Sequence, residues 1–300
     1  MTRSGFCALV GRPNVGKSTL VNAIVGTKVT ITSNTPHTTR GLVRGIVTEG
    51  ETQVIFVDTP GLHRPASRLG HRLNEAARAG TDGVDVIAVL VDASAEIGAG
   101  DRTALTLGLD TARPRGPRLV VVVNKMDRSG GEGTARQLLE VQGVVETLAR
   151  ERGREEVLDS VEYFPVSART GRGVSDLVAF IFAQMPEGPW FFPEEEVSDV
   201  PEAVWVAELV REQLVRKTRQ EIPHSIHCRV SEFEWPHVTV EIVVERESQK
   251  GMVIGKGGHL LKEVGIGARR QLPEGCYLEL RVVVEDDWQR RDDVMDRFGL

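Results

Sequence analysis

Short apolar runs alternate with amphipathic stretches along the first part of the chain. Five runs rich in β-branched residues predict buried strands at residues 6–10, 54–57, 84–91, 119–123 and 163–166. Apolar positions at helical spacing lie between and after them, for example at residues 19–25 and 174–185. This alternation predicts an α/β domain with a mostly parallel sheet and helices on both faces. Ligands of such domains bind at the carboxyl ends of the strands.

A second pattern begins after a stretch rich in proline, glycine and glutamate. We predict a first domain at residues 1–186, a linker at 187–202 and a smaller α+β domain at 203–300. The second domain is predicted from a helical stretch (203–220), two strands (224–230 and 238–244), another helix (259–271) and a last strand (277–284). The charged residues 287–300 form either a helix packed on this domain or a loose tail.

Composition and charge exclude several classes of protein. Hydrophobic residues make up 40% and charged residues 27% of the chain, as in globular proteins. A net charge of -6 argues against bulk, nonspecific nucleic-acid binding, although a local basic site remains open. Three widely spaced cysteines indicate neither a disulfide framework nor a zinc site. No apolar run approaches the roughly 20 residues that span a bilayer, and the strand at 6–10 leaves no room for an export signal, so we expect a cytoplasmic protein.

A phosphate-binding motif follows the first strand directly. Residues 11–18 match G-x-x-x-x-G-K-[ST] and precede a helical stretch, as a P-loop requires. In such a loop the backbone N–H groups surround phosphate oxygens, Lys17 supplies positive charge and the Ser18 hydroxyl binds Mg²⁺. The predicted phosphate-binding residues are Gly11, Arg12, Pro13, Asn14, Val15, Gly16, Lys17, Ser18 and Thr19.

A carboxylate stands at the end of the next predicted strand, in the run Asp58, Thr59, Pro60, Gly61, Leu62. There Asp58 would reach Mg²⁺ and the Gly61 amide would sense the γ-phosphate. The polar loop between the two motifs contains Thr38 and Thr39, and we choose Thr39 as a second magnesium ligand, with Thr38 next. A purely structural pair of loop threonines is the alternative.

The base is predicted by the run Asn124, Lys125, Met126, Asp127 after the strand at 119–123. A carboxylate at Asp127 accepts hydrogen bonds from both the ring N–H and the exocyclic amine of guanine. Adenine offers neither donor in that arrangement, so it leaves the acceptor unpaired. Ser167 and Ala168, after the strand at 163–166, would support the guanine carbonyl through backbone N–H groups. GTP is therefore the expected nucleotide, and an ATPase or small-molecule kinase is disfavoured.

These motifs, in this order, resemble those of translation-factor-related GTPases. The runs 11–20, 31–33 and 58–63, together with the second domain, are similar to the Era family over nearly the whole chain. Leu62 stands where many small GTPases carry a glutamine that orients water, and we expect it to pack or point away. For His63 we expect a solvated loop position rather than a role in positioning water, so we name no general base.

The resemblance implies GTP hydrolysis and a set of catalytic residues. It implies that Asn14 ligates a potassium ion near the phosphates, in addition to Mg²⁺ held by Ser18, Thr39 and Asp58. The predicted catalytic residues are Lys17, Thr39, Asp58, Gly61 and Asn14.

The second domain carries G-x-x-G at the start of a predicted helix. Glycines there allow close approach of a nucleotide backbone, the helix end favours phosphate, and Lys256 adds charge. The order α-β-β-α-α-β resembles a type II KH domain, with Ile254 or Ile266 in the wall of an apolar groove. Six basic residues lie between positions 246 and 270: Arg246, Lys250, Lys256, Lys262, Arg269 and Arg270. The predicted RNA-binding residues are Ile254, Gly255, Lys256, Gly257, Gly258, Lys262, Arg269 and Arg270.

Single-stranded RNA is the ligand that this domain predicts, and a KH-shaped protein–protein module is the alternative. The family resemblance implies the 3′ end of small-subunit ribosomal RNA, engaged during assembly of the small ribosomal subunit. We expect a monomeric or transiently associating protein that binds no DNA and contacts a membrane at most peripherally. The rival function is an RNA chaperone with structural GTP and incidental turnover.

His37 departs from the glutamine frequent at its place in the family. His224 and His227 would lie on opposite faces of a strand, so we assign no metal to them.

Overall fold

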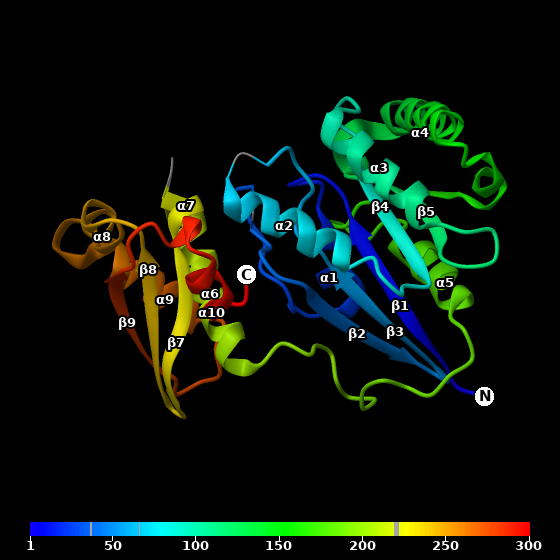
Figure 1. The fold of residues 1–300 in the computed structure, drawn as a ribbon. Coiled ribbons are helices and arrows are strands. Elements are labelled where there is room, and N and C mark those ends of the chain that lie inside the picture. Colours follow the sequence, from blue (N-terminus) through cyan, green and yellow to red (C-terminus); the bar gives the residue numbers. More distant parts are fainter. Residues whose placement is uncertain (37, 66, 219–221) are drawn as a thin grey trace. The chain divides into compact units, whose positions relative to one another are not determined.

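The protein is described by a computed structural model that covers residues 1–36, 38–65, 67–218 and 222–300. It divides into two compact units (Figure 1). The first comprises Met1–Thr30, Thr39–Pro65 and Arg72–Asp199, and the second comprises Ile31–Thr38, Ala66–His71 and Val200–Leu300. The second unit thus takes in two short segments from the amino-terminal part of the chain. His37, whose departure from the family pattern was noted above, lies outside the described residues.

The first unit contains a six-stranded sheet in the order β2-β3-β1-β4-β5-β6. All neighbouring strands are parallel except β2, which pairs antiparallel with β3. This confirms the predicted α/β fold. The strands are β1 (Arg3–Val10), β2 (Val43–Glu49), β3 (Thr52–Asp58), β4 (Val86–Asp92), β5 (Arg118–Asn124) and β6 (Glu162–Pro165).

Strand β2 is the one strand of this sheet that the hydrophobic pattern did not predict. It lies at the sheet edge, and only Gly45 and Ile46 within it are buried. An edge strand in which only Ile46 and Val47 are consecutive apolar residues lacks the apolar run that marks the central strands.

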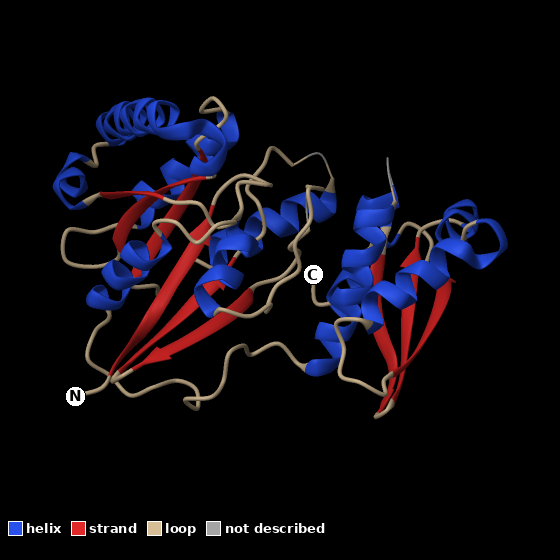
Figure 2. Ribbon diagram, turned by 180° about the vertical axis from the view of Figure 1, so that it is seen from behind, coloured by secondary structure: helices blue, strands red, loops and turns tan. Residues whose placement is uncertain are grey.

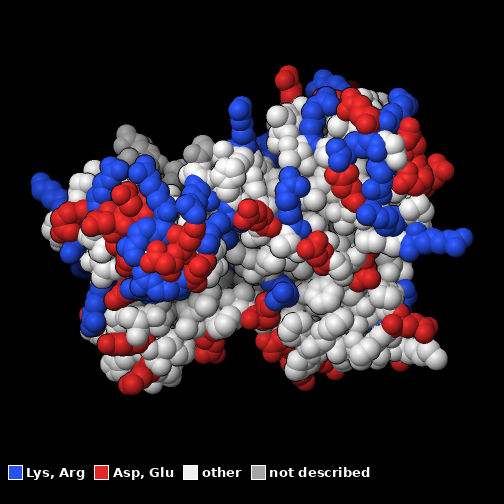
Figure 3. Space-filling view, in the orientation of Figure 1, with Lys and Arg blue, Asp and Glu red and all other residues white. Residues whose placement is uncertain are grey.

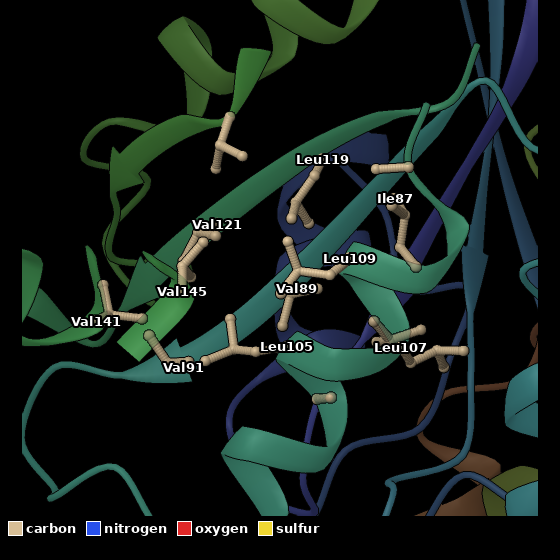
Figure 4. Packing of buried hydrophobic residues seen from close by; sticks show 14 of the residues in the cluster. Ile87, Val89, Val91, Leu105, Leu107, Leu109, Leu119, Val121, Val141 and Val145 are labelled. Atoms are coloured by element: carbon tan, nitrogen blue, oxygen red, sulfur yellow. The ribbon is translucent and has the colours of Figure 1, made fainter. Parts of the chain in front are cut away.

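Helices cover both faces of this sheet (Figure 2). On one face α1 (Lys17–Val25) and α5 (Val174–Gln184) pack against residues such as Cys7 and Leu9. On the other, α3 (Ala99–Thr111) and α4 (Met126–Arg152) pack against the alternate residues Ala8 and Val10, together with Ala77 of α2 (Arg68–Ala79). Figure 4 shows side chains of β4, β5, α3 and α4 meeting in this second layer. A short 3-10 helix, η1 (Glu155–Ser160), precedes β6.

Most of the proline- and glutamate-rich stretch packs along the first unit. The side-chain amide of Gln53 donates to Phe192 O at 2.9 Å. The backbone N–H of Ile46 donates to Val197 O, also at 2.9 Å, and the Phe6 and Phe191 rings lie 4.9 Å apart. Residues up to Asp199 therefore belong to the first compact unit.

The second unit contains a three-stranded sheet in the order β7-β8-β9, with β7 antiparallel and β9 parallel to β8. Its elements follow the predicted α-β-β-α-α-β order. They are α6 (Glu202–Lys217), α7 (Ile222–Ser225), β7 (His227–Glu234), β8 (His237–Val244), α8 (Glu247–Ile254), η2 (Lys256–Gly258), α9 (His259–Arg269) and β9 (Tyr277–Val284).

The predicted strand at 224–230 is wrong at its start. Residues 222–225 form α7, and β7 begins only at His227. His224 therefore belongs to α7 and His227 to β7, so the two histidines do not share a strand. Part of the predicted helix at 203–220 lies outside the description, since α6 ends at Lys217 and residues 219–221 are not described.

The end of the chain is a packed helical segment rather than a loose tail. It consists of η3 (Trp288–Arg290) and α10 (Asp292–Arg297). Trp288 is fully buried and its indole N–H donates to Ser225 O at 3.0 Å. The Phe298 ring stacks on His227, with ring centroids 4.2 Å apart. Within the described ranges, none of the helices is both long and apolar enough to cross a membrane.

Candidate nucleotide-binding and RNA-binding sites

The loop at residues 11–16 joins β1 to α1. Asn14 and Gly16 have positive φ angles of 64° and 102°, the left-handed conformation that asparagine and glycine tolerate best. The Lys17 side chain is buried and folds back over the loop, where its Nζ donates to the carbonyl oxygens of Gly11 and Arg12 at 3.2 and 3.3 Å. Burial lowers the pKa of Lys17 to about 8, while the charge of Asp58 opposes that shift. The loop therefore holds a cation that an anionic ligand would stabilise.

A cluster of oxygen atoms surrounds Asp58 at the end of β3. Its Oδ2 accepts hydrogen bonds from the hydroxyls of Ser18 at 2.7 Å, Thr30 at 3.0 Å and Thr39 at 3.3 Å. The Ser18 and Thr39 hydroxyls lie 3.0 Å apart. Burial raises the pKa of Asp58, while Lys17 and these hydroxyls lower it.

The other carboxylate oxygen of Asp58 tests whether Mg²⁺ fits. Asp58 Oδ1 is buried and has no hydrogen-bond partner among the described residues. An orphaned buried carboxylate oxygen is costly unless a cation or water binds it. Together with the Ser18 and Thr39 hydroxyls it forms a hard, oxygen-only donor set, which is what Mg²⁺ prefers. The residues present therefore fit the metal.

Of the two candidate threonines, the structure brings Thr39 and not Thr38 to this cluster. The Thr38 hydroxyl instead donates to Thr35 O at 2.7 Å. Thr30 is a member that the sequence did not single out. Its only signal was a hydroxyl in the polar loop before the threonine pair, and nothing in the pattern distinguished it from its neighbours.

The run after Asp58 lies against the phosphate loop. The backbone N–H of Leu62 donates to Gly11 O at 3.0 Å, and a Cβ built on Gly61 would lie 2.8 Å from Pro13 atoms. Leu62 is 1% exposed and packs in the hydrophobic core, as expected of a residue that does not orient water.

His63 is half-buried with its Nδ1 3.0 Å from Gly61 O, so it is not a solvated loop residue as predicted. Thr59 is buried and donates to Leu9 O.

Asn124 ties together two of the predicted nucleotide-binding segments. Its Nδ2 donates to Val15 O at 2.8 Å and its Oδ1 accepts from the Ala168 backbone N–H at 3.0 Å. The neighbouring Lys125 side chain donates to Asn14 O at 2.6 Å. Residues far apart in the sequence, near positions 15, 124 and 168, therefore meet at the carboxyl end of the sheet.

The Asp127 carboxylate is held in an ionised, oriented state. Its Oδ1 accepts from the Ser167 hydroxyl at 2.6 Å, and Oδ2 accepts from Arg169 Nε at 3.0 Å. These hydrogen bonds, Ser167 first and Arg169 second, lower the pKa of Asp127. The carboxylate is thus an acceptor near neutral pH, as guanine recognition requires.

Two residues here were missed by the sequence analysis. Asp92 ends β4 and accepts from the Lys125 side chain at 2.7 Å. The signal for it was available, because Asp92 follows a buried strand just as Asp58 does. Arg169 comes directly after Ser167 and Ala168, but a surface arginine in a loop has no pattern of its own.

The glycine loop between α8 and α9 has an exposed backbone. Gly255, Gly257 and Gly258 all have positive φ angles, of 73°, 59° and 76°. A Cβ on Gly255 would lie 2.8 Å from Leu260 Cβ, whereas nothing lies within 4 Å of a Cβ on Gly257 or Gly258. The first glycine is thus needed for close packing, and the other two leave open space next to the N-terminus of α9.

Basic and apolar side chains border this loop. Lys256, Lys262, Arg269 and Arg270 are exposed, and Ile254 and Ile266 are half-buried. Figure 3 shows basic and acidic side chains interleaved on the second unit rather than an unbroken basic field. The arrangement suits a short local contact with a nucleotide backbone more than sequence-independent binding of long nucleic acid.

Comparison with known proteins now decides the family. Residues 6–125 match the model described as 50S ribosome-binding GTPase, and residues 221–289 match the KH domain model. GTPase Era of Mycobacterium tuberculosis (strain ATCC 25177 / H37Ra) is 44% identical over 99% of this chain and 98% of its own length. The chain belongs to the Era family of GTPases. Era of Carboxydothermus hydrogenoformans is 41% identical, over 99% of this chain and 97% of its own.

Solved Era structures have the same fold over the whole chain. Era in complex with MgGDPNP and nucleotides 1506-1542 of 16S ribosomal RNA matches with a TM-score of 0.86 and 35% identity, covering 100% of this chain and 99% of that one. A single-residue variant of Aquifex aeolicus Era bound to GDP·AlF4⁻ matches equally well, with a TM-score of 0.86 and 35% identity over 99% of each chain. As a member of the Era family, this chain is a GTP-hydrolysing enzyme with a KH domain.

Proposed function

We infer that this Era-family protein is a switch in which GTP binding and hydrolysis control its hold on single-stranded RNA. The RNA we propose is the 3′ end of small-subunit ribosomal RNA, and the process is assembly of the small ribosomal subunit. The observation that carries this proposal is the open Gly257-Gly258 backbone at the start of α9, in a chain that aligns end to end with an Era bound to 16S ribosomal RNA.

The nucleotide would occupy the carboxyl end of the first sheet. The loop 11–16 and Lys17 would hold the phosphates, with Thr19 in the first turn of α1. Asp127 would accept the two guanine donors, while Asn124, Lys125, Ser167 and Ala168 support the base site. Met126 contributes its backbone, since its N–H donates to Val166 O.

Hydrolysis would rest on charge and positioning rather than on a general base. Mg²⁺ held through Ser18, Thr39 and Asp58 would neutralise charge on the β- and γ-phosphates. Lys17 adds a second positive charge, and the Gly61 amide would contact the γ-phosphate. Because Leu62 is buried in the core, orientation of the attacking water must come from another group.

RNA would bind along the glycine loop and α9. Gly255, Gly257 and Gly258 allow the nucleotide backbone to approach, and Lys256 and Lys262 supply charge next to it. Arg269 and Arg270 lie at the far end of α9, where they would contact phosphates further along the strand. Ile254 would border the groove in which the bases rest.

We assign residues 1–186 as the GTPase domain, 187–202 as the linker and 203–300 as the KH domain with its tail. We propose that the protein acts in the cytoplasm as a monomer or transient complex, with at most peripheral membrane contact. An RNA chaperone with structural GTP is the alternative function. It predicts the same RNA affinity in both nucleotide states.

A potassium ion near Asn14 is a further part of the proposal. Asn14 already adopts a left-handed conformation that places its carbonyl oxygen on Lys125 Nζ, 2.6 Å away. A second cation beside the phosphates would stabilise charge that develops in the transition state. We expect GTP turnover to be about tenfold faster in potassium than in sodium buffer at equal ionic strength. Equal turnover in the two buffers would exclude the ion.

The RNA target is tested by comparing two oligonucleotides. One copies the 3′ end of small-subunit ribosomal RNA, and the other has the same composition in scrambled order. We expect the first to bind about tenfold or more tightly in the presence of a nonhydrolysable GTP analogue, because KH domains discriminate bases over about four nucleotides. Equal binding of the two would leave the GTPase assignment intact and remove this RNA as the specific target.

A further inference from the structure

Helix α6 is hydrogen-bonded to the loop that leads into the oxygen cluster around Asp58. That cluster consists of Ser18, Thr30, Thr39 and Asp58 and is called the magnesium cluster below. The second compact unit contains residues Ile31–Thr38 together with α6. The backbone N–H of Thr32 donates to Glu212 Oε1 at 3.0 Å. Arg216 Nη2 donates to Thr32 O at 3.1 Å, and Arg211 donates to Thr38 O. Three charged side chains within two turns of one helix therefore hold the backbone of this loop at Thr32 and Thr38.

Two of these charges are deeply buried. Glu212 is 0% and Arg211 is 1% exposed. A buried charge is costly unless it is paired and hydrogen-bonded, so removal of one partner is strongly destabilising. Part of the pairing is internal to α6, from Glu208 to Arg211 and from Arg216 to Glu212. Other partners include backbone atoms of Thr32 and Thr38, so the stability of this cluster depends in part on the backbone conformation at those two residues.

The loop ends at residues of the magnesium cluster. Thr30 precedes it and Thr39 follows it, and both hydroxyls donate to Asp58 Oδ2. Only one peptide bond separates the Thr38 carbonyl held by Arg211 from Thr39. Displacement of Thr39 by roughly the length of a hydrogen bond would therefore disturb the bonds to α6.

The other side of α6 faces the helix that follows the glycine loop. Glu212 Oε2 accepts from Gln271 Nε2, at the end of α9, at 3.4 Å. A Cβ on Gly267 of α9 would lie only 2.3 Å from Gln213 Oε1, so the two helices approach closely there. The two oxygens of one buried carboxylate thus contact the loop on one side and α9 on the other.

We propose that Glu212 and Arg211 are positioning residues for GTP hydrolysis, supplied by the RNA-binding unit. They hold the backbone at Thr32 and at Thr38, the residue that precedes Thr39, and through Gln271 they transmit the state of that backbone to α9. This inference rests on the proposed switch function and names the side chains that link its two sites. In such a switch, GTP tightens RNA binding by some factor. By thermodynamic linkage, bound RNA then favours the GTP-bound state by the same factor.

The test is Glu212→Gln in the full chain, with Glu202→Gln as the matched control. Glu202 lies in the exposed first turn of the same helix and undergoes the same chemical change. Two quantities are measured: the ratio of RNA dissociation constants with GDP and with a nonhydrolysable GTP analogue, and kcat and KM for GTP. We expect Glu212→Gln to reduce the ratio about fivefold or more and to lower kcat more than it changes KM. The control should leave both at the wild-type values.

A variant in the turn after α9 covers the case in which Glu212→Gln fails to fold. Gln271→Ala removes the contact to Glu212 Oε2 from an exposed residue. We expect it to reduce the ratio while kcat without RNA stays unchanged, since the contacts of α6 with the loop remain. The proposal is overturned if both variants keep the wild-type ratio and kcat. If the wild-type ratio itself is one, the proposed switch fails instead, so the two failures are distinguishable.

Discussion

Asp127→Asn is expected to exchange guanine for xanthine as the preferred base. The carboxylate presents two acceptors to the N1–H and 2-amino donors of guanine, whereas an amide presents one acceptor and one donor. Xanthine has a carbonyl in place of the 2-amino group, so it pairs with that amide. We expect GTP affinity to fall by about a thousandfold, and XTP to bind in its place, because a buried polar group left unpaired costs several kcal/mol. Direct titration of the wild type and the variant with fluorescent GTP and with fluorescent XTP measures the exchange.

The matched control for this substitution is Asp159→Asn. Asp159 is exposed in η1, away from the nucleotide-binding segments, and undergoes the same change of charge. It should leave GTP affinity unchanged. If Asp127→Asn retained wild-type affinity for GTP, the base site would have to lie elsewhere.

Gly257→Asp is expected to abolish binding of single-stranded RNA while GTP hydrolysis continues. Gly257 has φ 59°, and nothing lies within 4 Å of a Cβ built on it. Aspartate tolerates this left-handed conformation better than most residues, so the fold should persist. The added negative charge would face the phosphates of a bound strand, and we expect a loss of RNA affinity of about a hundredfold.

Gly257→Asn separates charge from size in the same position. Asparagine is nearly isosteric with aspartate and also tolerates a positive φ, but it is neutral. It should therefore weaken RNA binding much less than Gly257→Asp does. Equal losses for the two variants would mean that space, not electrostatic repulsion, limits the approach of the strand. Unchanged affinity in both would place the RNA elsewhere on the molecule.

The elements that a strong pattern marks could be predicted from the sequence. Strands β4 and β5 are buried on both faces of the sheet, so apart from polar end residues they are apolar, and most of these apolar residues are β-branched. The half-buried edge strand β2 carries no such signal. Helix α7 has only four residues, too few to show a helical period, so its end was taken as the start of the following strand. The hydrophobic pattern therefore predicts long, buried elements, and it misses short or exposed ones.

The candidate site divides in a similar way. The residues proposed to bind the nucleotide follow strands and carry motifs, so Lys17, Asp58 and Asp127 could be predicted from spacing. Thr30 and Arg169 act through contacts with those residues and have no motif of their own. The hydrogen bonds of α6 to the loop Ile31–Thr38 join positions about 180 residues apart, and no local sequence pattern predicts such a pairing.

RNA affinity in two nucleotide states decides between a GTP-gated switch and an RNA chaperone. The dissociation constant of the 3′-end oligonucleotide is measured for the wild-type chain with GDP and with a nonhydrolysable GTP analogue, at one salt concentration and with saturating Mg²⁺. A GTP-gated switch predicts binding about fivefold or more tighter with the analogue. Identical dissociation constants in the two states would contradict the switch and favour an RNA chaperone that holds GTP structurally.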